Sequence, residues 1–233
     1  MGFLRTIAFI ILFYYLFKFA ARILFPIFLQ LLVKNRWPFR LHATYNESIT
    51  RFLNVIEEVN KETSLNGLVW FFDHADTVTE ENMQRIKALG GGIAIQHRMA
   101  YQGESFIRRY GKKAALNSPP VKRMLELGIP VGLGTDGTRV ASYNPWMSLY
   151  WIVSGKSLGG NQVMAKENTL DRQTALQLYT AGGYDLIKEK QKGKLILITS
   201  HLLSELDDLI TEIIFMQEGE VHFHKKVAVL KKE

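Results

Sequence analysis

Residues 67–96 read GLVWFFDHADTVTEENMQRIKALGGGIAIQ and contain one strand–helix–strand unit. The apolar run 67–72 is typical of a buried strand, and Thr79 is placed to cap the helix TEENMQRIKAL. Gly90, Gly91 and Gly92 then end that helix before a second apolar strand at 93–96. Two apolar strands joined by a helix predict a parallel sheet.

The same pattern recurs on both sides of this unit. Upstream, residues 38–43 (PFRLHA) predict a strand, and Asn46 is expected to cap the helix NESITRFLNVIEEVNK. Downstream, the helix VKRMLEL precedes a strand at 130–134 (PVGLG), and two helices follow at 145–154 and 170–181. The fold class is therefore α/β, with a parallel sheet that binds ligands at the carboxyl ends of its strands.

Polar side chains follow three of these strands at that same edge. His42 ends the first strand, His74 ends the second, and Asp136 follows the fourth in GLGTDGT. Two imidazoles and a carboxylate are ligands for a zinc- or iron-class ion, which indicates metal-assisted hydrolysis. Taken singly, each histidine is also explained as a hydrogen-bonded surface residue, and Asp136 as a turn residue or helix cap.

Residues 37–183 resemble the amidohydrolase superfamily of metal-dependent hydrolases, in the branch that acts on amides and related N-acyl compounds. The resemblance rests on the segments WPFRLHATYNESITRFL, FFDHADTVTEENMQRIKALGGGIAIQHRMAYQGESF, PPVKRMLELGIPVGLGTDGTRVASYNPWMSLYWIV and TLDRQTALQLYTAGG. It implies strands 5–8 of a (β/α)8 barrel and a divalent metal, zinc by expectation. It also implies a small amide-type substrate whose carbon–nitrogen bond is not a peptide bond.

By this resemblance His42 and His74 are metal ligands, Asp136 is both ligand and general base, and His97 and Arg98 face the substrate. The family's strand-1 His-x-His pair and strand-4 ligand would lie upstream of residue 37, where this sequence has no histidine. We therefore expect a half barrel with exposed strand edges, which would self-associate and show weak or no catalysis alone.

Residues 3–33 are almost wholly apolar and aromatic. The net charge of +7 comes mainly from residues 1–40, which carry six basic and no acidic side chains. We interpret residues 1–36 as a single-pass membrane helix with the downstream part in the cytoplasm, because more Lys and Arg follow the apolar stretch than precede it. An interfacial amphipathic helix and a cleaved signal peptide are the alternatives. This segment also resembles short single-span bacterial membrane proteins of unknown function.

Residues 184–233 form a third segment, expected to be a small α/β unit. We predict a charged helix at 184–193, a buried strand at 194–200, a helix at 201–212 and a terminal pair of strands at 213–219 and 220–230. The stretch KGKLILITSHLLSELDDLITEIIFMQEGEVHFHKK resembles the end of an ABC transporter ATP-binding subunit, which implies that His201 contacts a nucleotide phosphate. The chain has no G-x-x-x-x-G-K-[ST] phosphate loop, however, so a solvent-exposed His201 at a helix start explains the sequence better.

Composition narrows the possible functions. The chain has no cysteine, which excludes disulfides and thiolate metal sites. Residues 41–233 are nearly neutral and show no basic stripe, so nucleic acid is not an expected partner. Three hypotheses remain: a membrane-tethered hydrolase fragment, a membrane protein that docks on an ABC assembly, and a composite of unrelated parts joined near residues 36 and 184.

Overall fold

The structure is a computed structural model that describes the chain except residues 1, 138–140, 188–211, 218–219 and 227–233. Its centre is a four-stranded sheet in which the strand order follows the sequence and every neighbouring pair is parallel. The strands are β1 (Phe39–Ala43), β2 (Trp70–His74), β3 (Gly92–Gln96) and β4 (Val131–Gly134). The predicted parallel α/β sheet is confirmed, although β2 begins three residues later than expected and includes His74.

One face of the sheet is covered by α2 (Asn46–Glu62) and α3 (Glu80–Ala88). Alternation along β2 directs Trp70 and Phe72 to this face, where Trp70 donates a hydrogen bond to the Leu89 carbonyl and Phe72 packs against Phe52. Both side chains are fully buried. Apolar residues from alternate positions of the strands belong to the main hydrophobic core of the chain.

The helix caps agree with the sequence at α3 and differ at α2. Thr79 caps α3 as predicted, because its side chain accepts a hydrogen bond from the Asn82 backbone. The prediction that Asn46 caps α2 is wrong: Tyr45 holds that position, and it makes no side-chain cap. The Asn46 Oδ1 atom accepts hydrogen bonds from the Thr79 backbone N–H and the Asn82 side chain instead, at 3.0 and 2.8 Å. Asn46 therefore ties the β1–α2 loop to the start of α3.

The opposite face of the sheet is partly covered by α8 (Arg172–Leu186). We expected this helix to end at residue 181, but it continues through Gly182 and Gly183. A side chain at Gly182 would come within 2.6 Å of the Val131 carbonyl oxygen, and one at Gly132 within 3.3 Å of the Gly183 Cα. The glycine pair thus lets α8 lie directly on β4, rather than ending the helix.

Because Gly132 is level with Ala94, and Ala94 with Asp73 and His42, all four residues belong to the face that α8 covers. The helix covers only the β3–β4 half of that face: its Leu186 approaches Gly92, the residue level with Phe71. In the described part of the chain, α8 makes its extensive contacts with β4 and β3 and not with β1 and β2, the strands that carry His42 and Asp73.

Two further helices, α4 (Arg98–Tyr110) and α5 (Lys112–Leu116), were not predicted. Their sequence follows His97 without a strong cap, and α4 begins with no side-chain hydrogen bond at its N-cap. The remaining elements are α6 (Val121–Glu126), α7 (Pro145–Ser154) and the 3-10 helix η1 (Lys166–Asn168). The bounds of α7 agree with the prediction.

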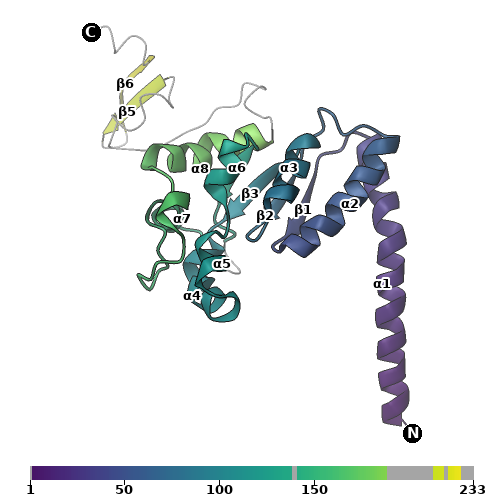
Figure 1. Ribbon diagram of the computed structural model, residues 1–233. Coiled ribbons are helices and arrows are strands. Elements are labelled where there is room, and N and C mark those ends of the chain that lie inside the picture. Colours follow the sequence, from purple (N-terminus) through teal and green to yellow (C-terminus); the bar gives the residue numbers. More distant parts are fainter. Residues whose placement is uncertain (1, 138–140, 188–211, 218–219, 227–233) are drawn as a thin grey trace.

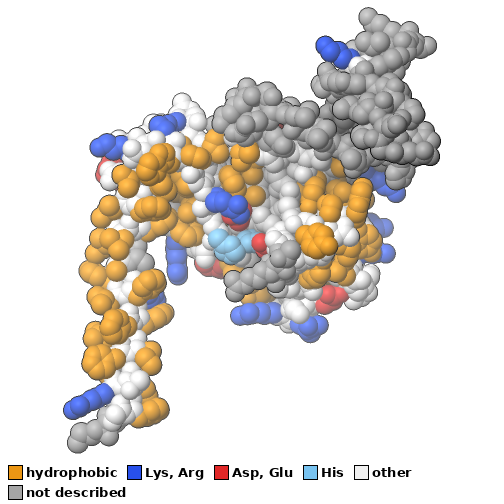
Figure 2. Space-filling view, turned by 180° about the vertical axis from the view of Figure 1, so that it is seen from behind, with side chains coloured by type: hydrophobic (Ala, Val, Ile, Leu, Met, Phe, Trp, Pro, Cys, Tyr) orange, Lys and Arg blue, Asp and Glu red, His pale blue; other side chains and the backbone are white. Residues whose placement is uncertain are grey.

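The N-terminal segment is one helix, α1 (Gly2–Lys34), which extends away from the sheet (Figure 1). Its last turns pack on α2: Leu29 and Val33 are fully buried, and the Phe25 ring lies 5.2 Å from that of Phe52. Its N-terminal part is exposed and apolar, as Figure 2 shows. By length and composition α1 is able to cross a membrane, a test that an N-terminal signal sequence also meets.

The C-terminal segment contains the predicted pair of terminal strands, β5 (Glu212–Gln217) and β6 (Glu220–Lys226), which are antiparallel. The strand predicted at 194–200, the helix predicted to start at residue 201, and His201 itself lie outside the described residues. Residues 184–186, expected to start a separate charged helix, are the last turn of α8.

Candidate functional site

His42, His74 and Asp136 lie at the carboxyl edge of the sheet, on β1, at the end of β2 and just after β4. The imidazole rings of His42 and His74 are 4.4 Å apart between centroids and nearly perpendicular. The Nε2 atom of His74 lies 3.9 Å from Asp136 Oδ2. His74 therefore contacts both of the other predicted ligands, and Figure 2 shows histidine side chains at the surface on this face.

The backbone at two of these positions is unusual. His74 has φ = 73°, its neighbour Ala75 has φ = 52°, and Asp136 has φ = 55°, all in the left-handed region. Such a conformation in a residue other than glycine costs about 1–3 kcal/mol, and it persists only where its surroundings hold it. At β2 the support is visible, because Gln96 Oε1 accepts a 2.9 Å hydrogen bond from the His74 N–H and Ala75 donates to the Ala43 carbonyl.

The electrostatic setting favours a neutral His74. The residue is 3% exposed, and burial lowers its pKa, although the negative charge of Asp76 opposes that effect. Its Nδ1 atom is buried without a hydrogen-bond partner. The side chain of Asp136 is 37% exposed, so the carboxylate reaches solvent at the edge of the site.

These donors fit a zinc-class ion in kind. Neutral imidazole nitrogen and carboxylate oxygen are common zinc ligands, and three protein ligands leave a coordination position free for water. As the side chains stand, no group of three or more His, Asp and Glu residues in the described part of the chain is gathered closely enough to enclose an ion. The arrangement is two adjoining pairs that share His74: its ring lies against His42 and its Nε2 atom faces Asp136, while its Nδ1 atom is buried without a hydrogen-bond partner.

His97, predicted to face the substrate, is fully buried next to these residues. Its Nδ1 atom is hydrogen-bonded to the Ser148 hydroxyl, and its Nε2 atom is buried without a partner. Burial lowers the pKa of His97, while the charge of Asp136 raises it, which places the two side chains in one electrostatic environment. His97 thus offers a second unpartnered imidazole nitrogen at this edge of the sheet.

Arg98, the other residue predicted to face the substrate, is held in an ion pair. Its guanidinium donates to Asp76 Oδ2, with a 2.8 Å bond from Nε and a second bond from Nη2. It also lies 5.9 Å from the centre of the Tyr45 ring. Asp76 is completely buried, so the pair joins the start of α4 to the loop that follows His74.

The sequence reasoning missed several residues that support the site. Asp73 is buried, receives a 2.7 Å hydrogen bond from Arg40 Nε, and lies on the same face of the sheet as His42. From α8, the Tyr179 hydroxyl is hydrogen-bonded to Ser148 and Thr135, and burial raises its pKa. The alternation of side chains between the two faces of β2 could have placed Asp73 on the face of the sheet that carries His42. Nothing in the local sequence places Tyr179 against the loop after β4.

One cavity in the described part of the chain lies away from these residues. It has a volume of about 510 Å³ and lies at the amino ends of β1 and β2, at the opposite edge of the sheet. Its lining includes Arg36, Phe39, Arg40, Phe71 and Ile187. It does not contain the predicted metal or substrate residues.

A sequence model of the Amidohydrolase family matches residues 24–196 of this chain. The match begins within α1 and continues 13 residues past residue 183, so it extends on both sides of the region predicted from the motifs. Among curated proteins, 5-methylthioadenosine/S-adenosylhomocysteine deaminase of Desulforamulus reducens is 28% identical over 186 residues, which is 73% of this chain and 39% of that protein. The chain therefore spans about two fifths of the length of this relative.

Two solved structures have a similar fold. Both are described as uncharacterized metal-dependent hydrolases. The one from Pyrococcus horikoshii OT3 has a TM-score of 0.54 and 20% identity, and covers 66% of this chain and 30% of its own. The one from Pyrococcus furiosus has a TM-score of 0.53 and 23% identity, with 65% and 29% covered. At these identities the similarity shows the fold alone, an α/β arrangement with a parallel sheet.

Proposed function

Since this chain belongs to the amidohydrolase family, we propose that it is a metal-dependent hydrolase acting on carbon–nitrogen bonds other than peptide bonds, with its site at the carboxyl edge of the β1–β4 sheet. The single observation that carries this proposal is the position of His74 between His42 and Asp136. The left-handed backbone at both His74 and Asp136 supports it, because strain of this kind gathers at functional sites.

In this proposal His42, His74 and Asp136 hold one divalent ion, and we expect zinc. When bound, such an ion would strongly lower the pKa of a coordinated water, to about 7, which would supply a nucleophile at neutral pH. Asp136 is both ligand and general base, since its exposed carboxylate is within reach of solvent at the edge. His97 faces the substrate, where its unpartnered Nε2 atom is available for a hydrogen bond.

We propose a role for Arg98 that differs from the substrate contact implied by the family resemblance. Its guanidinium is engaged with the buried Asp76, two residues after His74. We propose that it positions the His74 loop rather than binding the substrate directly. The substrate class is a small amide-type molecule, and we expect slow turnover from this chain alone, because the β1–β2 face beside the histidines has no second wall among the described residues.

The test is metal analysis of the full chain in a mild detergent, followed by assays on N-acyl amino acids and simple amides. We expect the wild type to keep up to one divalent metal ion per chain through gel filtration. We expect His74→Ala to lose that metal. His222→Ala, on the hairpin strand β6, is the matched control and should keep the metal. Equal metal content in wild type and His74→Ala would refute the site, whatever the activity.

A second proposal concerns location. We propose that α1 tethers the chain to a membrane as a single-pass helix, with the sheet on the cytoplasmic side. The exposed apolar side chains of its N-terminal half support this, among them Leu12 at 60% and Phe13 at 64% exposed. Flotation of the full chain with phosphatidylcholine vesicles tests it, and Leu12→Arg should reduce the floated fraction several-fold. Unchanged flotation of that variant would count against insertion.

Among the described residues β1 and β4 are the edge strands of the sheet, which supports self-association, and we propose this as a property of the isolated chain. Light scattering after gel filtration measures it directly, and a single monomeric mass at micromolar concentration would disprove it.

A further inference from the structure

The direction of α1 relative to the sheet fixes which edge of the sheet lies toward its apolar end. The C-terminal end of α1 lies at the amino edge, because Arg36 donates a 2.9 Å hydrogen bond to the carbonyl of Ser64 in the loop before β2. The chain then reverses into β1, so the strands run back along α1 toward its N-terminus. The carboxyl edge and the exposed half of α1 therefore lie on the same side of the molecule (Figure 1).

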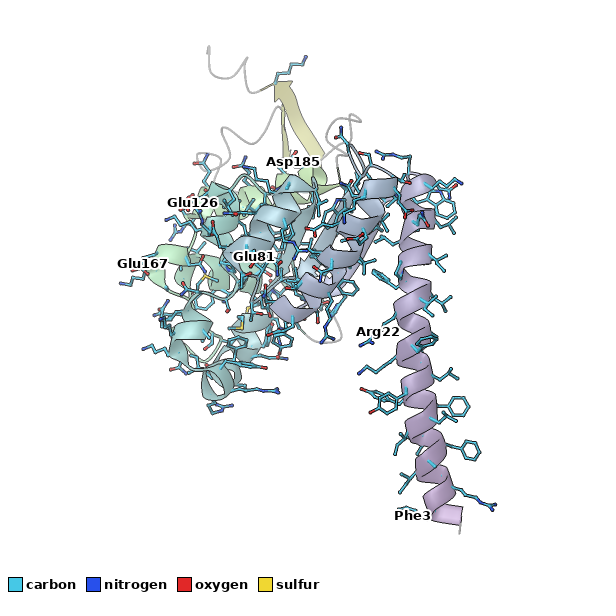
Figure 3. All side chains as sticks on the ribbon, turned by 45° about the vertical axis from the view of Figure 1, so that its right-hand side comes forward. Phe3, Arg22, Glu81, Glu126, Glu167 and Asp185 are labelled. Carbon is cyan, nitrogen blue, oxygen red and sulfur yellow. The ribbon has the colours of Figure 1, made fainter. Side chains whose placement is uncertain are left out.

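The packing of α1 on α2 shows which residues of α1 are level with the carboxyl edge of the sheet. The Phe25 ring contacts the Phe52 ring in α2, which runs parallel to α1. Asn46, at the start of α2, lies six residues before Phe52, or about 9 Å along the helix. The same step along α1 reaches Phe19, between Lys18 and Arg22. Figure 3 agrees, since Arg22 lies level with the lower part of the sheet domain.

A bilayer that receives the residues below Lys18 would therefore have its surface near the carboxyl edge. The helix from Gly2 to Phe17 is about 24 Å long, somewhat less than the ~30 Å of a hydrocarbon core. Lys18 and Arg22 lie where headgroups would be, with Lys18 Nζ 5.0 Å from the Tyr14 ring. With residues 2–17 of α1 inserted in the bilayer, the carboxyl edge of the sheet lies at the level of the headgroups.

At this level the domain presents a basic surface, which we call the basic tip: Arg108, Arg109, Lys112 and Lys113, at the junction of α4 and α5. All four are exposed, and no salt bridge in the described part of the chain involves them. No acidic residue occurs from residue 105 to residue 125. Figure 2 shows Lys and Arg side chains at this lower end of the domain.

Glu104, one turn before Arg108 on α4, is an acidic side chain beside the basic tip, where it accepts hydrogen bonds from Ser157 and Asn161. The four acidic side chains that Figure 3 labels, Glu81, Glu126, Glu167 and Asp185, are all above Arg22 in that view. Next to the tip, the Tyr110 side chain is 43% exposed, an amphipathic group of the kind found at membrane interfaces. Four exposed cations that form no salt bridge in the described part of the chain, and an exposed tyrosine, lie on the side toward which the apolar helix extends. Even with Glu104 near Arg108, this surface has the charge and depth that suit an anionic bilayer.

We infer that the basic tip docks on anionic phospholipid headgroups and holds the carboxyl edge of the sheet against the membrane. The inference rests on the membrane tether proposed above, and it adds a second, electrostatic contact and an orientation. It is independent of the proposed hydrolysis. Each basic side chain near an anionic surface contributes roughly a five-fold change in partitioning.

The natural absence of cysteine allows a direct test. The full chain with Ala114→Cys, an exposed position on α5, carries an environment-sensitive fluorophore and is reconstituted in phosphatidylcholine vesicles with or without one third phosphatidylglycerol. We expect a blue shift only with the anionic lipid, reversed by 1 M salt. The same label at Asn66→Cys, at the amino edge, should not respond.

Charge variants make the test specific. Lys112→Glu together with Lys113→Glu should weaken docking by at least roughly 25-fold, the product of two five-fold steps. Lys87→Glu, an exposed cation near the end of α3 at the amino edge, should leave it unchanged. Equal responses of the labels at 114 and 66, or no effect of anionic lipid at 114, overturns the inference.

The outcomes also separate this inference from the tether. A chain that floats with phosphatidylcholine vesicles but gives no anionic response at 114 refutes docking and leaves the tether standing. A chain that floats with neither lipid refutes both. A response at 114 to soluble duplex DNA and not to vesicles would assign the basic tip to a polynucleotide and overturn the membrane assignment.

Discussion

Removing the guanidinium of Arg98 should destabilise this fold more than any exposed ion pair does. Its partner Asp76 is completely buried, and the Arg98 side chain is 17% exposed. Asp76 Oδ1 already has no hydrogen-bond partner, so Arg98 is the main compensation for that carboxylate. Breaking a buried pair by removing one partner typically costs about 3–5 kcal/mol.

We therefore expect Arg98→Leu to lower the free energy of unfolding by about 3–5 kcal/mol, a large part of the 5–15 kcal/mol that is usual for a domain. Urea denaturation followed by circular dichroism, in a mild detergent that keeps α1 soluble, measures the loss. Arg123→Leu is the matched control. The Arg123–Glu80 pair is nearly half exposed on both sides, and pairs of that kind contribute about 1 kcal/mol or less.

A double variant separates the effect of the buried charge from that of lost packing. Asp76→Ala with Arg98→Leu removes more atoms than Arg98→Leu alone, yet it leaves no uncompensated carboxylate. We expect the double variant to be the more stable of the two. If it is equally stable or less stable, or if Arg98→Leu costs less than 1 kcal/mol, the assignment of the pair as a buried electrostatic tie between α4 and the His74 loop is wrong.

Three other substitutions test the packing and the caps. Gly182→Val should cost about 1–3 kcal/mol in urea denaturation, because its side chain would meet the Val131 carbonyl, whereas a helix-ending glycine would tolerate it better. Asn46→Ala should cost about 1–3 kcal/mol by the same measurement, since it leaves donors around α3 without their acceptor. Asp171→Ala should cost about 1 kcal/mol above pH 4, because hydrogen bonds from Thr174 lower the pKa of Asp171 below its usual 3.8. That contribution is present above the unfolded-state pKa and is lost as the pH falls through the lower folded-state pKa, so wild type and Asp171→Ala should converge in acid.

The sheet and the edge that carries the site were predictable because their signals are local. Apolar runs that stop on polar residues mark strand ends, and parallel connections bring those ends together, which is why His42 and His74 were expected to meet. Thr79 was predictable as a cap for the same reason. Such patterns carry information only over neighbouring residues, and the helix expected around residues 145–154 is present as α7.

The features that depend on distant contacts were not predictable. Asn46 looks like a cap in sequence, but its side chain is taken by residues more than thirty positions away. Gly182 looks like a helix end, but its role is set by the Val131 carbonyl on another element. The roles of Tyr179 and Ser148 depend likewise on how α7 and α8 lie across the end of β4, which no local pattern encodes.

The position of α8 has a consequence for how this sheet can be extended. In a closed (β/α)8 barrel, the sheet face that carries His42 and Gly132 turns inward and is filled by side chains from all eight strands. Here a whole helix lies on the β3–β4 half of that face, seated by two glycines. A closed barrel cannot form while α8 lies on this face. Strands that complete the barrel would first have to displace α8 from the space that becomes the barrel interior.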